Sequence, residues 1–311
     1  MPNASTTATY QSHGAAPPHG AAPSRDMAPE TRGAALDFLR LLAMEVSKGT
    51  VDLPCFPDVV VRIRHALANP STTMEKTVAI VGNEPRLAAR LLQTANSAAF
   101  NTSGKPLTDL RSAITRLGQQ LVQSAAMAFA IQQMKHAPAL RTIAKPLNEL
   151  WRDCILVASV SQAVAERTKI SPDEAFLTGL LHGIGRLYIM VRAVGQVEKL
   201  GGDQSFLDLI ADWHASIGKA VLENWGFAEE MSNAVGEQDD HERRWVRGEE
   251  LSDILVVSVV LAAAMKSPTS PPVALDRISA FQHIGLTAND CAAILTQAKR
   301  HLGSLHDALG G

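Results

Sequence analysis

Two short segments contain residue types that could do chemistry, but each lacks a residue that its reaction requires. His241-Glu242 begins like the helix of a zinc protease, in which a second histidine follows four residues after the first. That position is Trp245 here, so the zinc site is incomplete. The Gly-x-Gly at residues 183–185 begins like a dinucleotide-binding loop, but Tyr188 stands in place of the third glycine. Neither a zinc protease nor a dinucleotide-binding enzyme is therefore predicted.

Other common catalytic patterns are missing from the sequence. It contains neither the GxxxxGK of a phosphate-binding loop nor the GxSxG turn of a serine hydrolase. Its three cysteines, Cys55, Cys154 and Cys291, are far apart and form no CxxC pair. They predict reduced thiols rather than a disulfide framework or a zinc site.

The composition is typical of a folded domain that binds neither nucleic acid nor membrane. Of the 311 residues, 46% are hydrophobic and 19% are charged, and the formal net charge is −2. Proteins that hold nucleic acid or anionic lipid carry a basic excess, so this balance argues against both partners. The longest apolar stretch, residues 254–265, is too short to span a bilayer, and no secretory signal opens the sequence. We therefore expect a cytoplasmic protein.

Apolar residues recur at helical spacing along almost the whole chain, which predicts the all-α class. Ser171 followed by Pro172, with Glu174 three residues after the serine, is typical of a helix start. Asn-Gly and Asp-Gly hairpin turns and alternating apolar patterns are absent from the sequence. One apolar series, from Ile114 to Phe129, predicts one continuous helix of roughly six turns. The series are Leu36, Leu39, Leu42 and Val46; Leu87, Leu91, Ala95 and Ala98; and Ile114, Leu117, Leu121, Ala125 and Phe129.

Composition divides the chain into three parts. Residues 1–33 are rich in Ala, Pro, Gly, Ser and Thr. They bury too little apolar surface to offset the entropy of ordering, so we predict a disordered tail. Pro138 and Pro146 interrupt the helical pattern and predict a boundary between two helical lobes, residues 34–140 and 141–311.

Two groups of motifs follow each other along the chain and together carry a family resemblance. The first group includes Ala95-Asn96-Ser97-Ala98-Ala99-Phe100, after Leu53-Pro54-Cys55-Phe56-Pro57 and Asn83-Glu84-Pro85 and before Leu117-Gly118. The second includes Gly179-Leu180-Leu181-His182-Gly183-Ile184-Gly185, after Trp151 and before His214, Gly218 and Trp225-Gly226. In this order and spacing they resemble the bacterial HDOD family, the HD-related output domain proteins, over residues 50 to 260.

The resemblance implies a two-lobe helical HDOD domain, with an HD-like helical bundle in the C-terminal lobe. In HD phosphohydrolases, His and Asp side chains from several helices hold one or two divalent metals, which polarise a phosphoryl oxygen and activate a water. Gly183 and Val259 would offer no side-chain donor to a metal. The positions that correspond to these ligands are Asp153, His182, Gly183, Gln238, Asp239 and Val259.

His182 is the position at which the HD ligand type is kept. With Asp153, and with His214 and Asp239 as further donors, it could form a weak metal site of mixed ligands. The preferred interpretation is that His182 is a buried histidine that hydrogen-bonds a neighbouring helix. We therefore expect no catalytic residue, no metal and no cofactor.

Other polar and aromatic residues invite a structural or a binding role. Asn96 is predicted to satisfy backbone groups where a helix ends, with a ligand contact as the alternative. Trp151, Trp213 and Trp225 are predicted to anchor the core. Arg186 and His214 are candidates for contacting a ligand or a partner.

A basic cluster precedes the last apolar helix. Arg243, Arg244 and Arg247 follow the acidic residues Glu237, Asp239 and Asp240. The preferred interpretation is a solvated loop whose charges neutralise one another. Docking of a partner at Arg243 and Arg244 is the alternative.

The leading hypothesis for function is a non-catalytic bacterial signalling or regulatory scaffold that acts through protein–protein interaction. The resemblance implies output modules of bacterial signalling, often alongside cyclic di-GMP turnover proteins. The sequence contains no receiver, cyclase or phosphodiesterase domain, so other signalling proteins are expected to supply the input.

Three other functions stay open. One is a metal-dependent phosphohydrolase of the HD superfamily, against which the missing carboxylate at Gly183 weighs. Another is a pseudoenzyme that binds a nucleotide without hydrolysing it, with Arg186 near the phosphate. The last is a DNA-binding regulator, because residues 84–100 could pass for a helix-turn-helix. The few basic residues there, Arg86 and Arg90, and the net charge argue against it.

Overall fold

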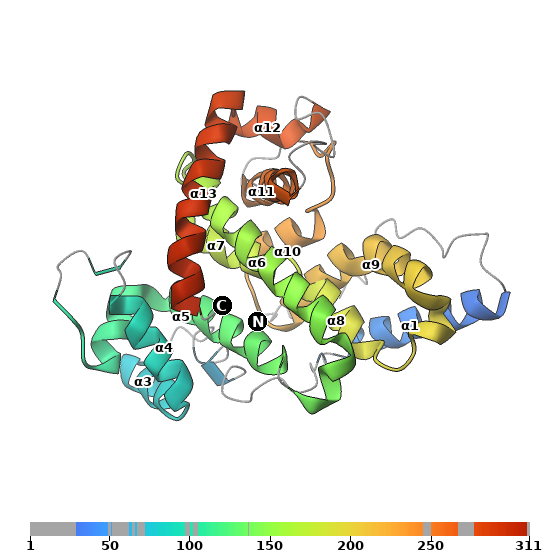
Figure 1. The fold of residues 1–311 in the computed structure, drawn as a ribbon, viewed down its shortest axis with the longest axis horizontal. Coiled ribbons are helices and arrows are strands. Elements are labelled where there is room, and N and C mark those ends of the chain that lie inside the picture. Colours follow the sequence, from blue (N-terminus) through green and yellow to red (C-terminus); the bar gives the residue numbers. More distant parts are fainter. Residues whose placement is uncertain are drawn as a thin grey trace, which may run out of the picture.

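The computed structural model describes residues 29–48, 51, 62–63, 66, 72–96, 100–101, 105–135, 137–244, 250–266 and 277–309. Within these ranges the secondary structure consists of α-helices and short 3-10 helices, without strands (Figure 1). The predicted all-α class is confirmed.

The helices are labelled in chain order in Figure 1. The first half of the chain contains α1 (Pro29–Ser47), α3 (Met74–Gly82), α4 (Pro85–Asn96), α5 (Leu110–Lys135), the 3-10 helix η1 (Pro138–Ile143) and α6 (Ala144–Ala165). The second half contains α7 (Pro172–Leu181), α8 (Ile184–Arg192), the 3-10 helix η2 (Val197–Leu200), α9 (Gly202–Asn224), α10 (Glu229–Gly236), α11 (Glu250–Lys266), α12 (Ser279–Ile284) and α13 (Ala288–Leu309).

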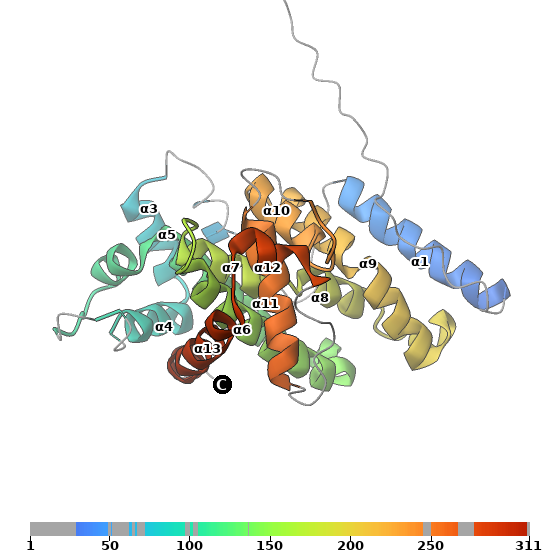
Figure 2. The same cartoon turned by 90° about the horizontal axis from the view of Figure 1, so that it is seen from above.

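The helix α6 lies at the centre of the fold. It packs against α7, α11 and α13, and α9 contacts both α8 and α10. Figures 1 and 2 show α3, α4 and part of α5 at one end of the molecule, and α1 beside α9 at the other. The helix α13 runs beside α6 and also contacts α4, so it connects the central helix to the end formed by α3–α5.

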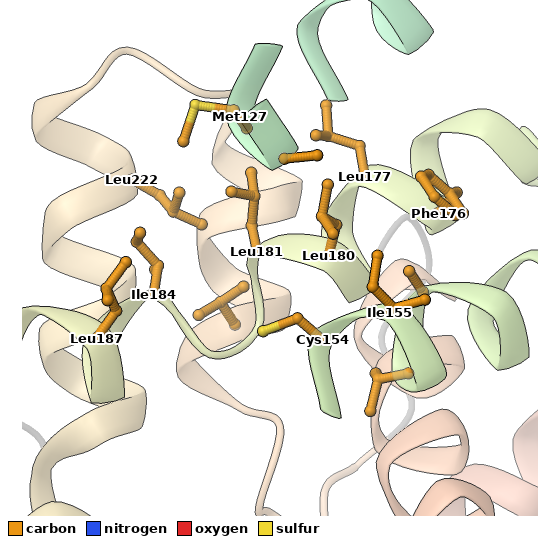
Figure 3. Packing of buried hydrophobic residues seen from close by; sticks show 14 of the residues in the cluster. Met127, Cys154, Ile155, Phe176, Leu177, Leu180, Leu181, Ile184, Leu187 and Leu222 are labelled. Carbon is orange, nitrogen blue, oxygen red and sulfur yellow. The ribbon is translucent and has the colours of Figure 1, made fainter. Parts of the chain in front are cut away.

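One apolar cluster fixes α7 and therefore the site that follows it. Leu180 and Leu181 are fully buried, and burying a leucine side chain contributes roughly 1.5–3 kcal/mol. Because α7 is held on several sides, the backbone at its C-terminal end has a fixed position. Figure 3 shows the contributors from five helices: Met127 of α5, Cys154 and Ile155 of α6, Leu177, Leu180 and Leu181 of α7, Ile184 and Leu187 of α8, and Leu222 of α9.

The start of α1 corrects the predicted end of the tail. Residues 29–33 are helical, although composition predicts disorder up to residue 33. Pro29 at the first helical position and Glu30 in the first turn favour a helix start there. Thr31 also lies close to Gly201, so tertiary packing supports the first turn. Residues 1–28 lie outside the described residues.

Hydrogen bonds from residues in the second half of the chain hold α1 and the residues after it in place. Glu45 accepts a hydrogen bond from the buried Tyr188 hydroxyl (2.6 Å) and another from Arg192 Nε (2.9 Å). Two further bonds reach backbone carbonyls, from Asn224 Nδ2 to Val46 (3.3 Å) and from the indole of Trp225 to Val51 (3.2 Å).

The third apolar series does not form one uninterrupted helix. Gly118 has φ 75° and ψ 166°, which breaks the helical path inside α5. A positive φ of this size favours glycine, because a side chain would be strained there. Leu117 before the break and Leu121 after it are both buried. The apolar pattern is therefore correct about burial and wrong about continuity.

The predicted helix start at Ser171 is confirmed. Its hydroxyl oxygen accepts the backbone N–H of Glu174 at 3.4 Å, and Pro172 is the first residue of α7. Near the predicted lobe boundary, α5 ends at Lys135, and Pro146 lies in the first turn of α6, where proline is tolerated. The division into two lobes at this point stays a prediction.

Several sequence features lie outside the described residues: the motif at residues 53–57 with Cys55, residues 97–99, Trp245, Arg247 and the segment 267–276. Among the helices that are described, none has the length and apolarity to cross a membrane.

Candidate functional site

The six positions that correspond to the HD ligands, called the HD-type positions from here on, lie on or directly after helices that contact one another. The helix α7 packs against α6, α10 and α11, so the elements that carry these positions surround its C-terminal end. Asp153 is on α6, His182 and Gly183 follow α7, Gln238 and Asp239 follow α10, and Val259 is on α11.

His182 is buried, and its ring is neutral at physiological pH. Its Nδ1 lies 2.7 Å from the carbonyl oxygen of Gly179. Since a carbonyl only accepts, Nδ1 carries the proton and donates it to this bond. Burial lowers the pKa of His182 to about 4, with further lowering by Arg186 and His214 that the bond to Gly179 does not offset. The hydrogen bond stays within its own helical turn, which corrects the prediction of a bond to a neighbouring helix.

A side chain at Gly183 would require the side chains of Cys154 and Leu150 to shift, and the glycine itself offers no carboxylate of an HD pair. A Cβ atom added at Gly183 would lie 2.8 Å from Cys154 Sγ and 2.8 Å from Leu150 Cδ1, closer than real Cβ contacts allow. The free space beside it is an apolar cavity of about 10 Å³, room for one water at most. The cavity is lined by Leu150, Cys154, Leu180, Leu181, Gly183, Ile184 and Leu187, most of them labelled in Figure 3.

Gln238 is fully buried and holds two helix ends together. Its Nε2 donates to the carbonyl of His182 (3.1 Å) and to that of Val235 (2.8 Å). Its Oε1 has no hydrogen-bond partner among the described residues. The amide nitrogen thus joins the end of α7 to the end of α10, which is a structural use of an HD-type position.

Asp153 and Val259 also have structural contacts in place of a metal-binding role. Lys266 Nζ lies 2.6 Å from Asp153 Oδ1, in a partly exposed ion pair between α11 and α6. Val259 is half-buried and packs against the apolar core.

His214 lies between a cation and a carboxylate. Its Nε2 is 3.2 Å from Arg186 Nη2 and 3.1 Å from Asp239 Oδ2. Arginine only donates and a carboxylate only accepts, so this nitrogen satisfies one of the two at a time. Burial alone raises the pKa of Asp239, but the hydrogen bond from His214 and the charges of His214 and Arg186 outweigh it and hold that pKa below its usual value. The ionised Asp239 favours Nε2–H as the donor.

This cluster also contains buried polar atoms without a partner among the described residues. They are His214 Nδ1, Arg186 Nε and the Oε1 of Gln238 already mentioned. His214 is 2% exposed, so water reaches its ring poorly. Buried polar groups without a partner cost free energy, so these atoms are candidates for contacting a bound polar group.

The described residues do not fit the divalent metal that the HD resemblance implies. Nowhere in the described ranges do three His, Cys, Asp or Glu side chains converge as a ligand set. Asp153 is paired with Lys266, and Gly183 and Val259 supply no donor atom at their positions. An HD-type centre needs converging carboxylate and imidazole ligands, which this arrangement does not supply.

Arg243 corrects the predicted solvated basic loop. Its side chain is 4% exposed and forms an ion pair with the equally buried Asp253, while its Nη2 donates to Glu237 at 3.0 Å. Arg244, the next residue, is exposed. Arg243 is therefore a structural ion-pair partner rather than a docking residue, because burial without a counter-charge would be costly.

Sequence reasoning placed Glu237 beside Arg243 but missed its second acidic partner, Asp253. Asp253 lies in α11 among apolar residues, and His283 Nδ1 of α12 is 3.1 Å from the same carboxylate. The hydroxyl of Ser279 donates to the carbonyls of His241 and Arg243, at 3.2 and 2.7 Å. The available signal was Asp253, an acid in the first turn of a helix that is otherwise mostly apolar, since such a residue is buried only with a partner.

Asn96 has the structural contacts that the sequence predicts. Its Nδ2 donates to the carbonyl of Leu107 (2.8 Å), and its Oδ1 accepts the N–H of Leu107 (2.7 Å). The amide thus closes the end of α4 against the segment before α5. Of the three predicted core anchors, Trp151 and Trp225 are buried, and Trp213 is half-buried.

Two wider grooves lie away from the HD-type positions. One, of about 450 Å³, is lined by residues of α13 together with Arg167 after α6. The other, of about 320 Å³, lies between α3 and the break in α5 at Gly118. Their polar side chains are arginine, threonine and glutamine, which form no acid–base or metal-ligating group.

Comparison with known proteins identifies the sequence pattern. The profile of the HDOD domain matches residues 53–241, more than half of the chain. A protein of Treponema pallidum (strain Nichols), itself uncharacterized, is 24% identical over 204 residues. These residues are 62% of this chain and 39% of that relative, so the chain spans well under half of the relative's length.

Solved structures share the fold at low sequence identity. A provisionally named metal-dependent phosphohydrolase from Shewanella amazonensis SB2B aligns with a TM-score of 0.67 and 22% identity, over 89% of this chain and 99% of that one. A provisionally named signal transduction protein from Marinobacter aquaeolei VT8 gives 0.63 and 20%, over 94% and 68%. An HDOD domain protein of unknown function from Geobacter sulfurreducens gives 0.59 and 21%, over 88% and 98%.

Proposed function

Because this chain belongs to the HDOD family, we propose that it is a non-catalytic regulatory protein of bacterial signalling that acts by binding other proteins. Cyclic di-GMP networks are the proposed setting, with partner proteins supplying the input. The likeness to signalling and phosphohydrolase structures supports a signalling-related protein with an HD-like fold.

One observation carries the proposal: the side chains at the HD-type positions are engaged in contacts inside the fold. Gln238 bonds two carbonyls, Asp153 pairs with Lys266, and the neutral His182 bonds its own turn. The ion pair with Lys266 would have to break before Asp153 could ligate a metal, and Gly183 and Val259 offer no side-chain donor. Phosphoryl transfer by an HD-type centre depends on that metal.

The chemical test is a direct search for turnover. Protein purified without chelators is supplied with manganese, nickel or iron and assayed on cyclic dinucleotides, nucleoside phosphates and a generic phosphate ester. We expect substoichiometric metal and no turnover above that of the His182→Ala variant. Near-stoichiometric metal, with turnover that His182→Ala abolishes, would overturn the proposal in favour of a phosphohydrolase.

The binding test is reconstitution with a purified partner. Proteins captured from native cell extract are identified by mass spectrometry, produced separately and mixed with this chain in calorimetry. We expect a saturable one-to-one complex that forms equally well with His182→Ala. If no captured protein binds once purified, a scaffold role is contradicted.

The unpartnered atoms beside His214 favour a second candidate function, a pseudoenzyme that binds a nucleotide. The donor Arg186 Nε and the ring nitrogen His214 Nδ1 are buried polar atoms without a partner in the described part of the chain. Thermal-shift measurements with nucleotides and cyclic dinucleotides decide between the two. A nucleotide at 100 times its dissociation constant would add about 2.7 kcal/mol of stability, and Arg186→Met should remove that gain.

A further inference from the structure

No element of the described part of the chain covers an apolar stripe on the outer face of α1. Among the described residues, the large hydrophobic side chains that are clearly exposed are Leu41 (40%), Met44 (49%) and Leu207 (57%). Leu41 and Met44 lie one turn apart on α1, whereas Leu207 is on α9. Soluble proteins scatter single exposed hydrophobic residues, but an adjacent pair on one helix face is typical of a contact surface.

The two faces of α1 have different roles. Ala35, Phe38 and Leu42 are buried, and α1 packs against η2 and α9. Figure 2 shows α9 on the inner side of α1 and α1 at the edge of the molecule. The opposite face therefore points away from the fold. This helix precedes residues 53–241, so the face belongs to a part of the chain outside the family match.

The outer face has the spacing of a helix–helix seam. Asp37, Leu41, Met44 and Lys48 are all exposed and follow one another at intervals of four, three and four residues. Residues at these intervals line one side of a helix and pack against a second helix. We call these four residues the α1 seam.

The α1 seam is complementary to a second copy of itself. Asp37 precedes Leu41 by four residues, and Lys48 follows Met44 by four. If a second α1 runs antiparallel, centred between Leu41 and Met44, each Leu41 faces Met44 of the other copy. Each Asp37, which pairs with Arg40 of its own helix at 3.1 Å, then also faces Lys48 of the other copy. A two-fold interface requires this self-complementarity, because both copies present the same patch.

We propose that two copies of this chain associate through antiparallel packing of their α1 seams. A contact between two helices of this length is smaller than the roughly 1,600 Å² of a standard stable interface. The dimer therefore forms and dissociates with protein concentration. The interface is independent of the HD-type positions, so it stands or falls apart from the proposed function.

The apolar centre is tested by sedimentation equilibrium of the full chain over a wide concentration range. We expect a monomer–dimer equilibrium that Leu41→Glu combined with Met44→Glu shifts by about tenfold or more toward monomer. Leu207→Glu is the matched control, since it charges an equally exposed leucine outside the seam and should leave the equilibrium unchanged. Circular dichroism confirms that each variant is folded.

The charged ends test the antiparallel geometry. Asp37→Lys and Lys48→Asp should each weaken the dimer, because each places like charges opposite one another. Mixing the two variants should restore dimers, since the mixed pair regains both opposite-charge contacts. A chain that stays monomeric at all concentrations overturns the proposal. So does a dimer that Leu207→Glu disrupts, or one that the charge variants leave unchanged.

Discussion

Two buried polar regions, one around Arg243 and one around His182, deal with burial in opposite ways. Around Arg243, opposite charges meet: the guanidinium faces Asp253 and Glu237, and His283 approaches the same aspartate. Around His182, the buried ring is neutral, and several polar atoms nearby have no partner in the described structure. The first region keeps its charges by pairing them. In the second region the His182 ring is buried without a charge.

The difference shows why residue type alone does not reveal a functional site. Arg243 looks like a docking residue in the sequence and is part of the structural framework. His182 looks like a metal ligand and is a neutral core residue that burial keeps unprotonated. What each residue does depends on whether a counter-charge reaches it from another helix.

Of the three substitutions considered, removing Arg243 should lower the free energy of unfolding the most. Arg243→Ala leaves Asp253 buried in α11 with His283 as its remaining partner, and an uncompensated buried charge is costly. We expect the free energy of unfolding to fall by about 3–5 kcal/mol, measured by chemical denaturation. Arg244→Ala is the control, since its side chain is exposed, and should change stability by about 0.5 kcal/mol or less. Equal effects of the two variants would contradict a buried ion pair.

Acid should weaken the His182 region. The pKa of His182 is lowered from 6.5 to about 4 in the folded chain, so the unfolded chain binds a proton that the folded chain excludes. Stability from this residue is present above pH 6.5 and is lost as the pH falls towards 4. The shift corresponds to about 3 kcal/mol.

Comparing the parent chain with a variant that lacks the ring assigns the pH effect to His182. Arg186, His214, Asp153 and Asp239 also act electrostatically on the ring. Unfolding free energies of the parent chain and of His182→Asn are therefore compared from pH 7.5 to 4. The parent should lose its stability advantage over the variant as the pH falls. A constant difference across this range would mean that the ring does not resist protonation.

Gln238 should give the smallest of the three effects. Gln238→Leu leaves the carbonyls of His182 and Val235 without the amide donor, but it also removes the unpartnered Oε1. We expect a loss of about 1–2 kcal/mol in thermal or chemical unfolding. Gln238→Glu replaces the donor by an acceptor at the same place and should be the more harmful change. If Gln238→Leu stabilised the protein, the hydrogen bonds of Gln238 to the two helix ends would make no net contribution to the free energy of unfolding.

Local structure was predictable where the information lies within a few residues. The capping serine at Ser171 and the amide of Asn96 act over short stretches, and both have the predicted contacts. The break at Gly118 was not predicted, because the apolar spacing continues across it and one glycine does not reveal its φ angle.

Contacts between distant segments were not predictable in the same way. The partner of Arg243 on α11 and the approach of His283 depend on how α11 and α12 pack. The family resemblance placed His182, Gly183 and Gln238 near one another, but it does not encode the hydrogen bonds that occupy them. The predicted solvated loop failed because spacing along the chain carries no information about burial at Arg243.

The fastening of α1 has a consequence for synthesis on the ribosome. Its anchors Tyr188, Arg192, Asn224 and Trp225 are translated well after Ser47, the last residue of the helix. At about 5–20 residues per second, the apolar inner face of α1 waits roughly 10–35 s for its binding surface. During this interval Phe38 and Leu42 are open to chaperones. Helix α1 is thus synthesised well before the residues that anchor it.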